Sequence, residues 1–253
     1  MADLELRLLE DSSFDEIPQP VRPDARCQTC DYWERIDGGR EAPIEPQGDA
    51  PVRAALKRRR LLGDRASAGP LAMLAYRTDA VAREAVGYAQ FGPLSAYPRA
   101  LSIRERYPQL PESPAPWVVT CLQVPVAAGS GPERERIGAD LLRAVCDELD
   151  RRGITAVEAY PEVVADAWIP SPGPASVYLA CGFERSAGDE HFPVFRRELS
   201  GETAADAWSD LLRAAAPDEG DDWPLPLPGA PGEDDFFRLP PDRPKRPNPF
   251  GED

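Results

Sequence analysis

The single histidine in this chain of 253 residues sets the first limit on its acid–base and nucleophilic chemistry. His191 precedes the strand-like run 192–195, and no G-x-S-x-G motif lies near it. A Ser-His-Asp or Cys-His hydrolase would have to use this histidine, because the chain has no other. A residue at the end of a strand is the simpler interpretation. A metal site built on several histidines is excluded.

Five cysteines include one close pair, Cys27 and Cys30, in a C-x-x-C spacing. A structural zinc site needs four ligands, commonly from two such pairs, and the chain has no second pair. The other cysteines, at 121, 146 and 181, fall in apolar strand or helix patterns. A redox pair is another alternative, although the motif does not join a strand to a helix as a thioredoxin-like site requires. We expect reduced thiols and no metal.

The elements that must position these residues follow a mixed α/β order. Residues 117–124 form a continuous, β-branched apolar run, which is typical of a strand buried on both faces. An amphipathic helix follows Pro132 and stops at Gly153, and a further strand at 154–160 completes one central βαβ unit. Other strands are expected at 4–8, 71–76, 85–91 and 191–199, other helices at 52–62 and 174–181, and a loop at 93–116.

The charge balance excludes several classes of partner. With 44 acidic and 29 basic residues the net charge is −15, which opposes general binding to nucleic acid and to anionic membranes. No apolar run approaches the ~20 residues that span a bilayer, and the start of the chain lacks the pattern of a signal peptide, so we expect a cytoplasmic protein. Residues 1–199 are expected to form one domain, and 200–253 an acidic, proline-rich tail with a short helix at 203–215.

Three segments carry a resemblance to a known family. Residues 175–183 read A-S-V-Y-L-A-C-G-F, residues 27–34 read C-Q-T-C-D-Y-W-E, and residues 87–93 read G-Y-A-Q-F-G-P. Together with the order of elements over 4–199, they resemble the GNAT superfamily of acyl-CoA N-acyltransferases, in particular a subgroup with an early C-x-x-C-x-Y-W-E segment. The resemblance implies a GNAT-like fold: a central, mostly antiparallel twisted sheet with a βαβ core that binds acyl-CoA.

The resemblance also implies where acetyl-CoA would bind as co-substrate. The family holds the pyrophosphate at the turn into the central helix, where backbone N–H groups and the helix dipole favour an anion. Its R/Q-x-x-G-x-G/A motif corresponds here to 133–138, with Glu133 and Arg136 replacing the leading Arg/Gln and the first glycine. Either 129–131 and nearby arginines replace the lost cradle, or binding has weakened and the arginines only coat the first helical turn. The expected cofactor contacts are Leu122, Gln123, Val124, Gly129, Gly131, Arg134, Arg136, Gly138 and Ala139.

By the same resemblance, Tyr178 is the expected general acid that protonates the departing CoA thiolate. The alternative is a tyrosine that packs the short helix on the sheet. Glu158 is the expected base toward the acceptor amine, directly or through water, unless it is an outward-facing strand residue. Trp33, Glu34 and Tyr88 are expected on the acceptor side, where an aromatic wall and a carboxylate suit a cationic amine. They could equally plug the open end of the sheet.

The sequence therefore predicts an N-acyltransferase that moves an acetyl group from acetyl-CoA to a primary amine by direct transfer in a ternary complex. The acceptor would be a small molecule or a peptide, and a homodimer is left open. A function of another class is a degenerate GNAT domain that serves as a binding or regulatory module without turnover.

Overall fold

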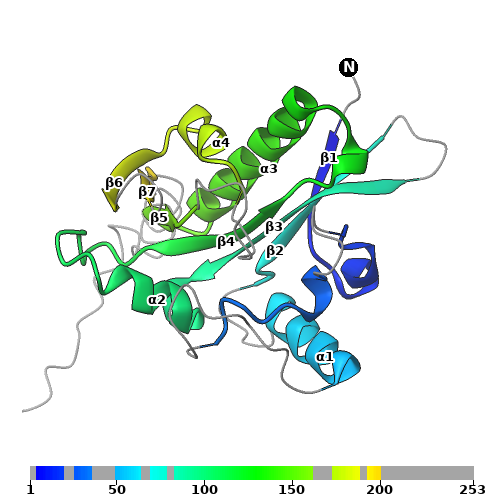
Figure 1. Cartoon of the computed structure of the whole chain (residues 1–253), viewed down its shortest axis with the longest axis horizontal. Helices are drawn as coiled ribbons and strands as arrows, with labels where there is room; N and C mark the ends of the chain where they lie inside the picture. The colour runs from blue at the N-terminus through cyan, green and yellow to red at the C-terminus, as the bar shows by residue number, and fades with distance from the viewer. Residues whose placement is uncertain are drawn as a thin grey trace, which may run out of the picture. The chain divides into compact units, whose positions relative to one another are not determined.

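A seven-stranded mixed sheet forms the centre of this computed structural model (Figure 1). The strand order is β1-β2-β3-β4-β5-β7-β6, in which the β4–β5 pair is parallel and the other pairs are antiparallel. The predicted mixed α/β class with a mostly antiparallel sheet is confirmed. The strands are β1 (Leu4–Leu8), β2 (Ala72–Arg77), β3 (Glu84–Pro93), β4 (Trp117–Gln123), β5 (Ala156–Ala159), β6 (Glu184–Gly188) and β7 (Pro193–Glu198).

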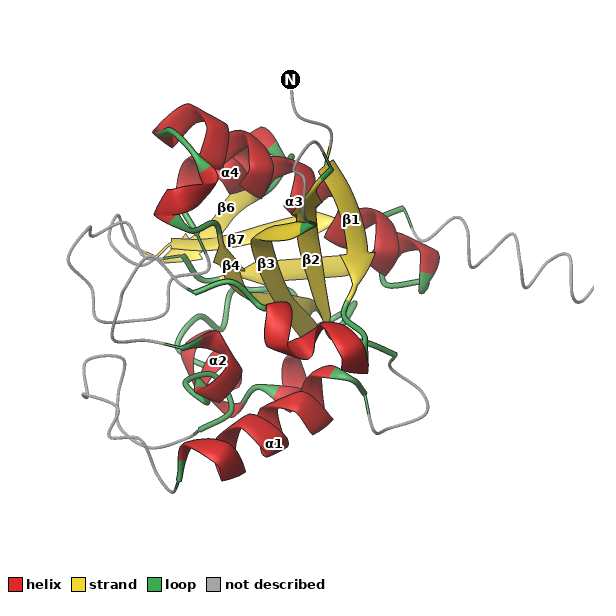
Figure 2. Ribbon diagram, turned by 90° about the vertical axis from the view of Figure 1, so that its right-hand side faces the viewer, coloured by secondary structure: helices red, strands yellow, loops and turns green. Residues whose placement is uncertain are grey.

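Helices cover both faces of the sheet (Figure 2). One face carries α3 (Gly131–Arg151) and α4 (Ala175–Ala180), and the other carries α1 (Ala50–Leu61) and α2 (Pro98–Arg104). Each face has its own apolar cluster, one packed against α3 and α4 and the other against α1 and α2. Short 3-10 turns connect these elements: η1 (Asp11–Glu16), η2 (Cys27–Thr29), η3 (Leu94–Ala96) and η4 (Val126–Ala128).

The structure describes residues 4–19, 26–35, 49–63, 69–78, 83–161, 173–188 and 193–200. They all belong to the unit Met1–Leu211, one of two into which the chain divides. His191 and the predicted tail with its helix at 203–215 lie outside the described residues. Among the described helices, none has the length and apolar composition needed to cross a bilayer.

The helix α3 ends as the sequence predicts. Gly153 has a φ of +74°, and its N–H donates to the carbonyl of Asp150 at 2.8 Å. The next N–H, that of Ile154, donates to the carbonyl of Leu149 at 3.0 Å. This pattern closes the helix and turns the chain directly toward β5, which is the geometry of a glycine-terminated helix.

One helix and one strand, α2 and β6, were not predicted from the sequence. The segment 93–116 was predicted to be a loop because of its many prolines, but it contains α2. Pro98 is the first residue of that helix, a position where the missing N–H has no partner to lose, and Ala100 and Ile103 then face the core. The strand β6 was not predicted because its residues are mostly exposed and lack an alternating apolar pattern.

Candidate functional site

The parallel strands β4 and β5 separate part-way along their length. Pairing joins Trp117, Val118 and Val119 of β4 to residues 157–159 of β5, where β5 ends. The strand β4 continues to Gln123 without a described β5 partner. The carboxyl ends of parallel strands that diverge in this way are where α/β sheets bind ligands.

A bulge in β4 accentuates this divergence. In the register with β3, Phe91 pairs with Val119 but Gln90 pairs with Cys121, so that Thr120 is an extra residue on β4. The hydroxyl of Thr120 donates to the carbonyl of Gln90 at 3.4 Å. Bulges of this kind bend a strand and are frequent beside active sites. We take residues 120–123 as the centre of the candidate site.

The predicted cofactor contacts at the end of β4 are mainly backbone. The Leu122 side chain is buried in the cluster against α3 and α4. Gly173, which has a φ of +92°, lies so close that an added Cβ would stand 3.2 Å from the Leu122 carbonyl oxygen. The segment that leads into α4 therefore closes on this end of β4. What Leu122, Gln123 and Val124 could offer a cofactor is their peptide groups.

The start of α3 lies within two residues of the prediction, in which the helix follows Pro132, but the pyrophosphate motif does not lie in a turn before it. The helix begins at Gly131, after the N-cap residue Ser130, so residues 133–138 lie inside its first two turns rather than in a preceding turn. Pro132 lies in the first turn and has no N–H to donate. The expected motif therefore does not form the turn, and the segment that could face an anion is 129–131 with the first-turn N–H groups.

One of the chain's own carboxylates lies beside this turn. An added Cβ on Gly129, which has a φ of +138°, would stand 2.1 Å from Glu133 Oε2. Arg77, at the end of β2, donates to the Ala128 carbonyl at 2.6 Å and to Glu133 Oε1 at 3.3 Å. A phosphate at the N-terminus of α3 would therefore meet a negative charge as well as the favourable helix dipole.

The two arginines expected at the cofactor differ in their contacts. Arg136 donates to Asp140 one turn further along α3 at 3.1 Å, so its guanidinium is directed away from the N-terminus. The Arg134 Nε atom is buried and has no hydrogen-bond partner among the described residues. Of the two, Arg134 is the one with a buried N–H left without a described acceptor.

The last two cofactor candidates pack α3 on its neighbours. An added Cβ on Gly138 would lie 3.7 Å from Val177 Cγ1 of α4. The carbonyl of Ala139 accepts a hydrogen bond from the Cys181 thiol at 3.5 Å. The structure therefore places Gly138 and Ala139 against α4, and Gly138 also beside Val124, whose Cγ2 would lie 3.8 Å from the added Cβ.

Tyr178 projects from α4 into the apolar cluster and is fully buried. Its ring meets the edge of Phe183 at 5.1 Å and stacks on Phe195 at 6.1 Å, measured between centroids. Burial raises the pKa of Tyr178 well above its usual value, with smaller contributions from nearby thiols, so the phenol stays protonated. A protonated phenol can act as a proton donor. It is also the form expected of a tyrosine that only packs α4 on the sheet.

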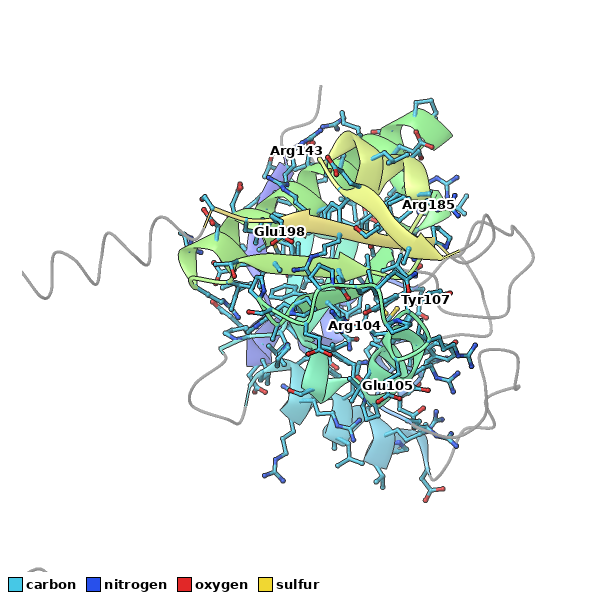
Figure 3. All side chains as sticks on the ribbon, turned by 90° about the vertical axis from the view of Figure 1, so that its left-hand side faces the viewer. Arg104, Glu105, Tyr107, Arg143, Arg185 and Glu198 are labelled. Atoms are coloured by element: carbon cyan, nitrogen blue, oxygen red, sulfur yellow. The ribbon has the colours of Figure 1, made fainter. Side chains whose placement is uncertain are left out.

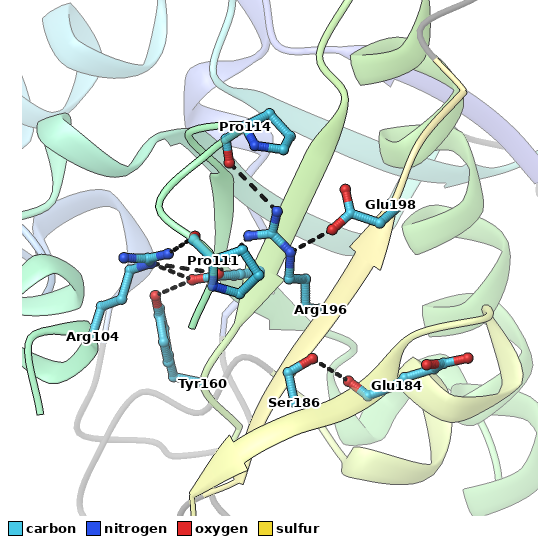
Figure 4. Close-up of polar contacts among 9 residues, drawn as sticks. Arg104, Pro111, Pro114, Tyr160, Glu184, Ser186, Arg196 and Glu198 are labelled. Carbon is cyan, nitrogen blue, oxygen red and sulfur yellow. Dashed lines mark hydrogen bonds and ion pairs between the residues drawn. The ribbon is translucent and has the colours of Figure 1, made fainter. Parts of the chain in front are cut away.

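Glu158 is buried between two arginines on the α1/α2 face. Figure 4 shows these arginines, Arg104 and Arg196, on either side of the Pro111–Pro114 segment. Its carboxylate accepts from Arg196 Nη1 at 2.8 Å, from Arg104 Nε at 3.1 Å and from the Tyr160 hydroxyl at 2.7 Å. The sequence left two alternatives for Glu158, a base toward the amine or an outward-facing strand residue. The second is wrong, since none of the Glu158 surface is exposed. Three donors already occupy the carboxylate, so an amine would have to displace one of them to reach it.

The same arginines also fasten the chain before β4. Arg104 donates to the carbonyl of Pro111 and Arg196 to that of Pro114 at 3.4 Å. Arg196 further donates to Glu198 at 2.6 Å, and this second carboxylate lies at the surface (Figure 3). Glu158 and its two arginines thus hold together α2, β7 and the loop between α2 and β4.

The three predicted acceptor-side residues lie on the same face as Glu158. Trp33 is buried, with its ring 5.1 Å from that of Tyr32 and 6.5 Å from that of Tyr160. Glu34 Oε1 accepts from Gln90 Nε2 at 3.1 Å, and Gln90 Oε1 accepts from the Tyr88 hydroxyl at 3.2 Å. The structure therefore joins Glu34 and Tyr88 through a glutamine that the sequence reading did not single out.

Lys57 of α1 is the second residue missed. Its ammonium donates to Glu34 Oε1 at 2.7 Å, and both side chains are about 95% buried. The Coulomb attraction of Glu34 raises the pKa of Lys57 against the opposing effect of burial, so the amine stays charged. One signal was present in the sequence: this is one of only two lysines in a chain with 27 arginines.

The five cysteines are free thiols. Burial raises the pKa of Cys27 to about 12 and also raises the pKa of Cys30 and Cys121. Protonated thiols are poor metal ligands and poor nucleophiles. Within the described part of the chain, no group of three His, Cys, Asp or Glu side chains could hold a metal ion.

Comparison with known proteins gives structural matches alone. No family model and no curated protein matches the chain. An arylalkylamine N-acetyltransferase-like 5b from mosquito has a TM-score of 0.47 at 13% identity, covering 78% of this chain and 100% of that one. An N-acetyltransferase from Staphylococcus aureus Mu50 has a TM-score of 0.43 at 12% identity, covering 79% and 99%.

A third match is a chain of the NatC complex bound to Gag peptide and CoA. Its TM-score is 0.43 at 12% identity, and the match covers 78% of this chain and 98% of that one. Two of these three matched proteins are N-acetyltransferases by name.

Proposed function

We propose that this chain transfers an acyl group, in the simplest case acetyl, from acyl-CoA to a primary amine. The observation that carries the proposal is the separation of β4 from β5 at the Thr120 bulge. Beyond Val119, the described part of β5 pairs with no residue of 120–122, and an extended amide-bearing arm such as that of CoA could pair there instead. The turn 129–131 follows β4 directly and leads into α3, whose N-terminus favours an anion.

The proposed reaction is a direct transfer. A neutral amine attacks the thioester carbonyl, the new C–N bond forms, and the C–S bond breaks with its electron pair on sulfur. The Tyr178 phenol donates its proton to this thiolate, and the proton lost by the nitrogen returns to the phenolate through solvent. The products are an amide and CoA, so no oxidant, reductant or metal is required.

Calorimetric titration with acetyl-CoA and with CoA tests the proposal, followed by mass spectrometry of mixtures with a panel of primary amines. We expect binding of both nucleotides and acyl transfer to at least one amine. No binding at millimolar acetyl-CoA would overturn the enzymatic function. Heat-denatured protein with the same mixtures controls for spontaneous acylation of the amines.

A binding or regulatory module without turnover is the second candidate. It is favoured by the carboxylate of Glu133 beside Gly129 and by the proline in the first turn of α3, both of which weaken a phosphate site. A module of this kind would bind acyl-CoA weakly or not at all and acylate none of the amines. The domain boundary at 199/200 is part of the proposal in either case.

A further inference from the structure

The ion pair between Lys57 and Glu34 lies in the interior, where a charge pair is retained at a cost in desolvation. The ammonium and the carboxylate are 4% and 5% exposed, and their closest atoms are 2.7 Å apart. The amide of Gln90 donates to the same carboxylate oxygen, Oε1, at 3.1 Å. Two donors therefore share one oxygen of Glu34.

The other carboxylate oxygen of Glu34 has no hydrogen-bond partner in the part of the chain that the structure describes. Glu34 Oε2 is buried, and no described residue donates a hydrogen bond to it. The indole N–H of the preceding residue, Trp33, is also buried and without a described acceptor. Buried polar atoms are rarely left unpaired, because each loses its bonds to water without replacement. The unused oxygen of Glu34 thus marks a position that a ligand N–H or a water molecule would fill.

The position of this dipeptide connects it to the separation of β4 from β5. Glu34 is bound to Gln90, the residue of β3 that pairs at the Thr120 bulge. Trp33 packs on Tyr160, directly after β5. The Trp33–Glu34 pair is therefore tied to both strands that diverge, and it lies on the face opposite Tyr178.

The electrostatics decide which form of an amine suits the free oxygen. Lys57 supplies a full positive charge at 2.7 Å, so the pair as a whole has no net charge with which to hold an ammonium ion. Burial raises the pKa of the titratable groups that interact with Glu34 besides Lys57, namely Cys30, Cys121, Tyr88 and Tyr97, and keeps them uncharged. Arg99 of α2 is a further buried cation beside this dipeptide, where its Nε donates to the Tyr32 carbonyl at 2.9 Å. No net negative charge is therefore left there to hold an ammonium ion.

We propose that Glu34 Oε2 accepts one N–H of the acceptor amine in its neutral form, and that the acceptors are amines of low basicity, such as α-amino groups, rather than lysine-like amines. This inference rests on the proposed acyl transfer. Lys57 acts as a positioning residue: it holds Oε1 and cancels the charge, so that Oε2 orients the nitrogen without trapping it as a cation.

The size of the preference follows from basicity. An α-amine has a pKa of about 8 and a side-chain ε-amine a pKa of about 10.4. At pH 7.5, about a quarter of the α-amine is therefore neutral, but only about 0.1% of the ε-amine. If the site takes only the neutral form, kcat/KM should favour the α-amine about 200-fold at pH 7.5. At pH 9.5 the preference should shrink to about tenfold.

The test compares two lysine amides that each carry one free amine, one blocked at the ε-nitrogen and one at the α-nitrogen, with acetyl-CoA saturating. For both, KM should fall with rising pH, about tenfold per unit well below the pKa of the amine, while kcat changes little. A KM that is independent of pH for an acylated ε-amine would overturn the inference while leaving acyl transfer intact. Absence of transfer to any amine would instead contradict the proposed function.

Variants of Lys57 separate positioning from folding. Lys57→Met leaves the carboxylate uncompensated, so KM for the ε-amine should lose its pH dependence, whereas Lys57→Arg should retain it. The matched control is Arg58→Met, on the same helix as Lys57. It breaks a solvent-exposed pair with Asp11 of η1 and should leave both pH profiles of KM unchanged. If Lys57→Met does not fold, the wild-type KM profile decides alone. A bound-acceptor structure with water at Glu34 Oε2 and no amine would also overturn the inference.

Discussion

Replacing Glu158 by alanine should destabilise the protein far more than a surface carboxylate would. The change removes a fully buried charge from between Arg104 and Arg196, whose side chains are 14% and 4% exposed. Removing one partner of a buried ion pair costs about 3–5 kcal/mol, because the remaining charge stays desolvated. We expect the free energy of unfolding to fall by this amount, out of a total that is typically about 5–15 kcal/mol.

Urea denaturation followed by circular dichroism measures the effect. With an m-value of about 2 kcal/mol/M, the unfolding midpoint should fall by about 2 M. Glu198→Ala is the matched control, since Glu198 binds the same Arg196 at 2.6 Å but is 61% exposed. Exposed pairs contribute less than about 1 kcal/mol, so the control should move the midpoint by less than about 0.5 M.

Equal shifts in the two alanine variants would refute this reasoning, because burial would then not decide the strength of the pair. A third variant, Glu158→Gln, separates anchoring from base catalysis. It keeps an acceptor for the Tyr160 hydroxyl, so we expect a midpoint between those of the wild type and Glu158→Ala, with turnover lowered in proportion to folding. An unchanged midpoint with turnover abolished would instead make Glu158 the general base.

Three further outcomes are expected. Glu133→Gln should tighten acetyl-CoA binding about two- to fivefold in calorimetry, because it removes a negative charge beside the N-terminus of α3; weaker binding would argue against a phosphate there. Tyr178→Phe should lower kcat about 10²- to 10⁴-fold with unchanged affinity for acetyl-CoA, and an unchanged kcat would leave Tyr178 as a core residue. Burial raises the pKa of Cys27 and of Cys146 to about 12, so only the unfolded chain loses these protons above about pH 8.5. Stability should therefore fall as pH rises, by up to about 1.4 kcal/mol per pH unit for each thiol, and Cys146→Ala should flatten the dependence of the urea midpoint on pH.

Much of the fold could be read from periodicity. The apolar run of β4, the amphipathic face of α3 and the terminating Gly153 are local patterns, and the β4–α3–β5 unit forms where they predict it. The failures have local causes as well. The helix α2 was not predicted because its segment is rich in proline, although Pro98 occupies a helix position that tolerates it. The pyrophosphate motif that was aligned to 133–138 lies inside α3 and not at the turn before it.

The sequence by itself determined which chemistry the chain could not do and which segments would form the sheet. A single histidine and a net charge of −15 needed no structure to limit the reactions and partners. Only the tertiary structure decided which cationic partners each candidate carboxylate has. Glu34 meets Lys57 from 23 residues away, and Glu158 meets Arg104 from 54 and Arg196 from 38. Such pairs depend on strand register and on which face each side chain occupies, and the charge of a buried carboxylate depends on the partners that this register brings to it.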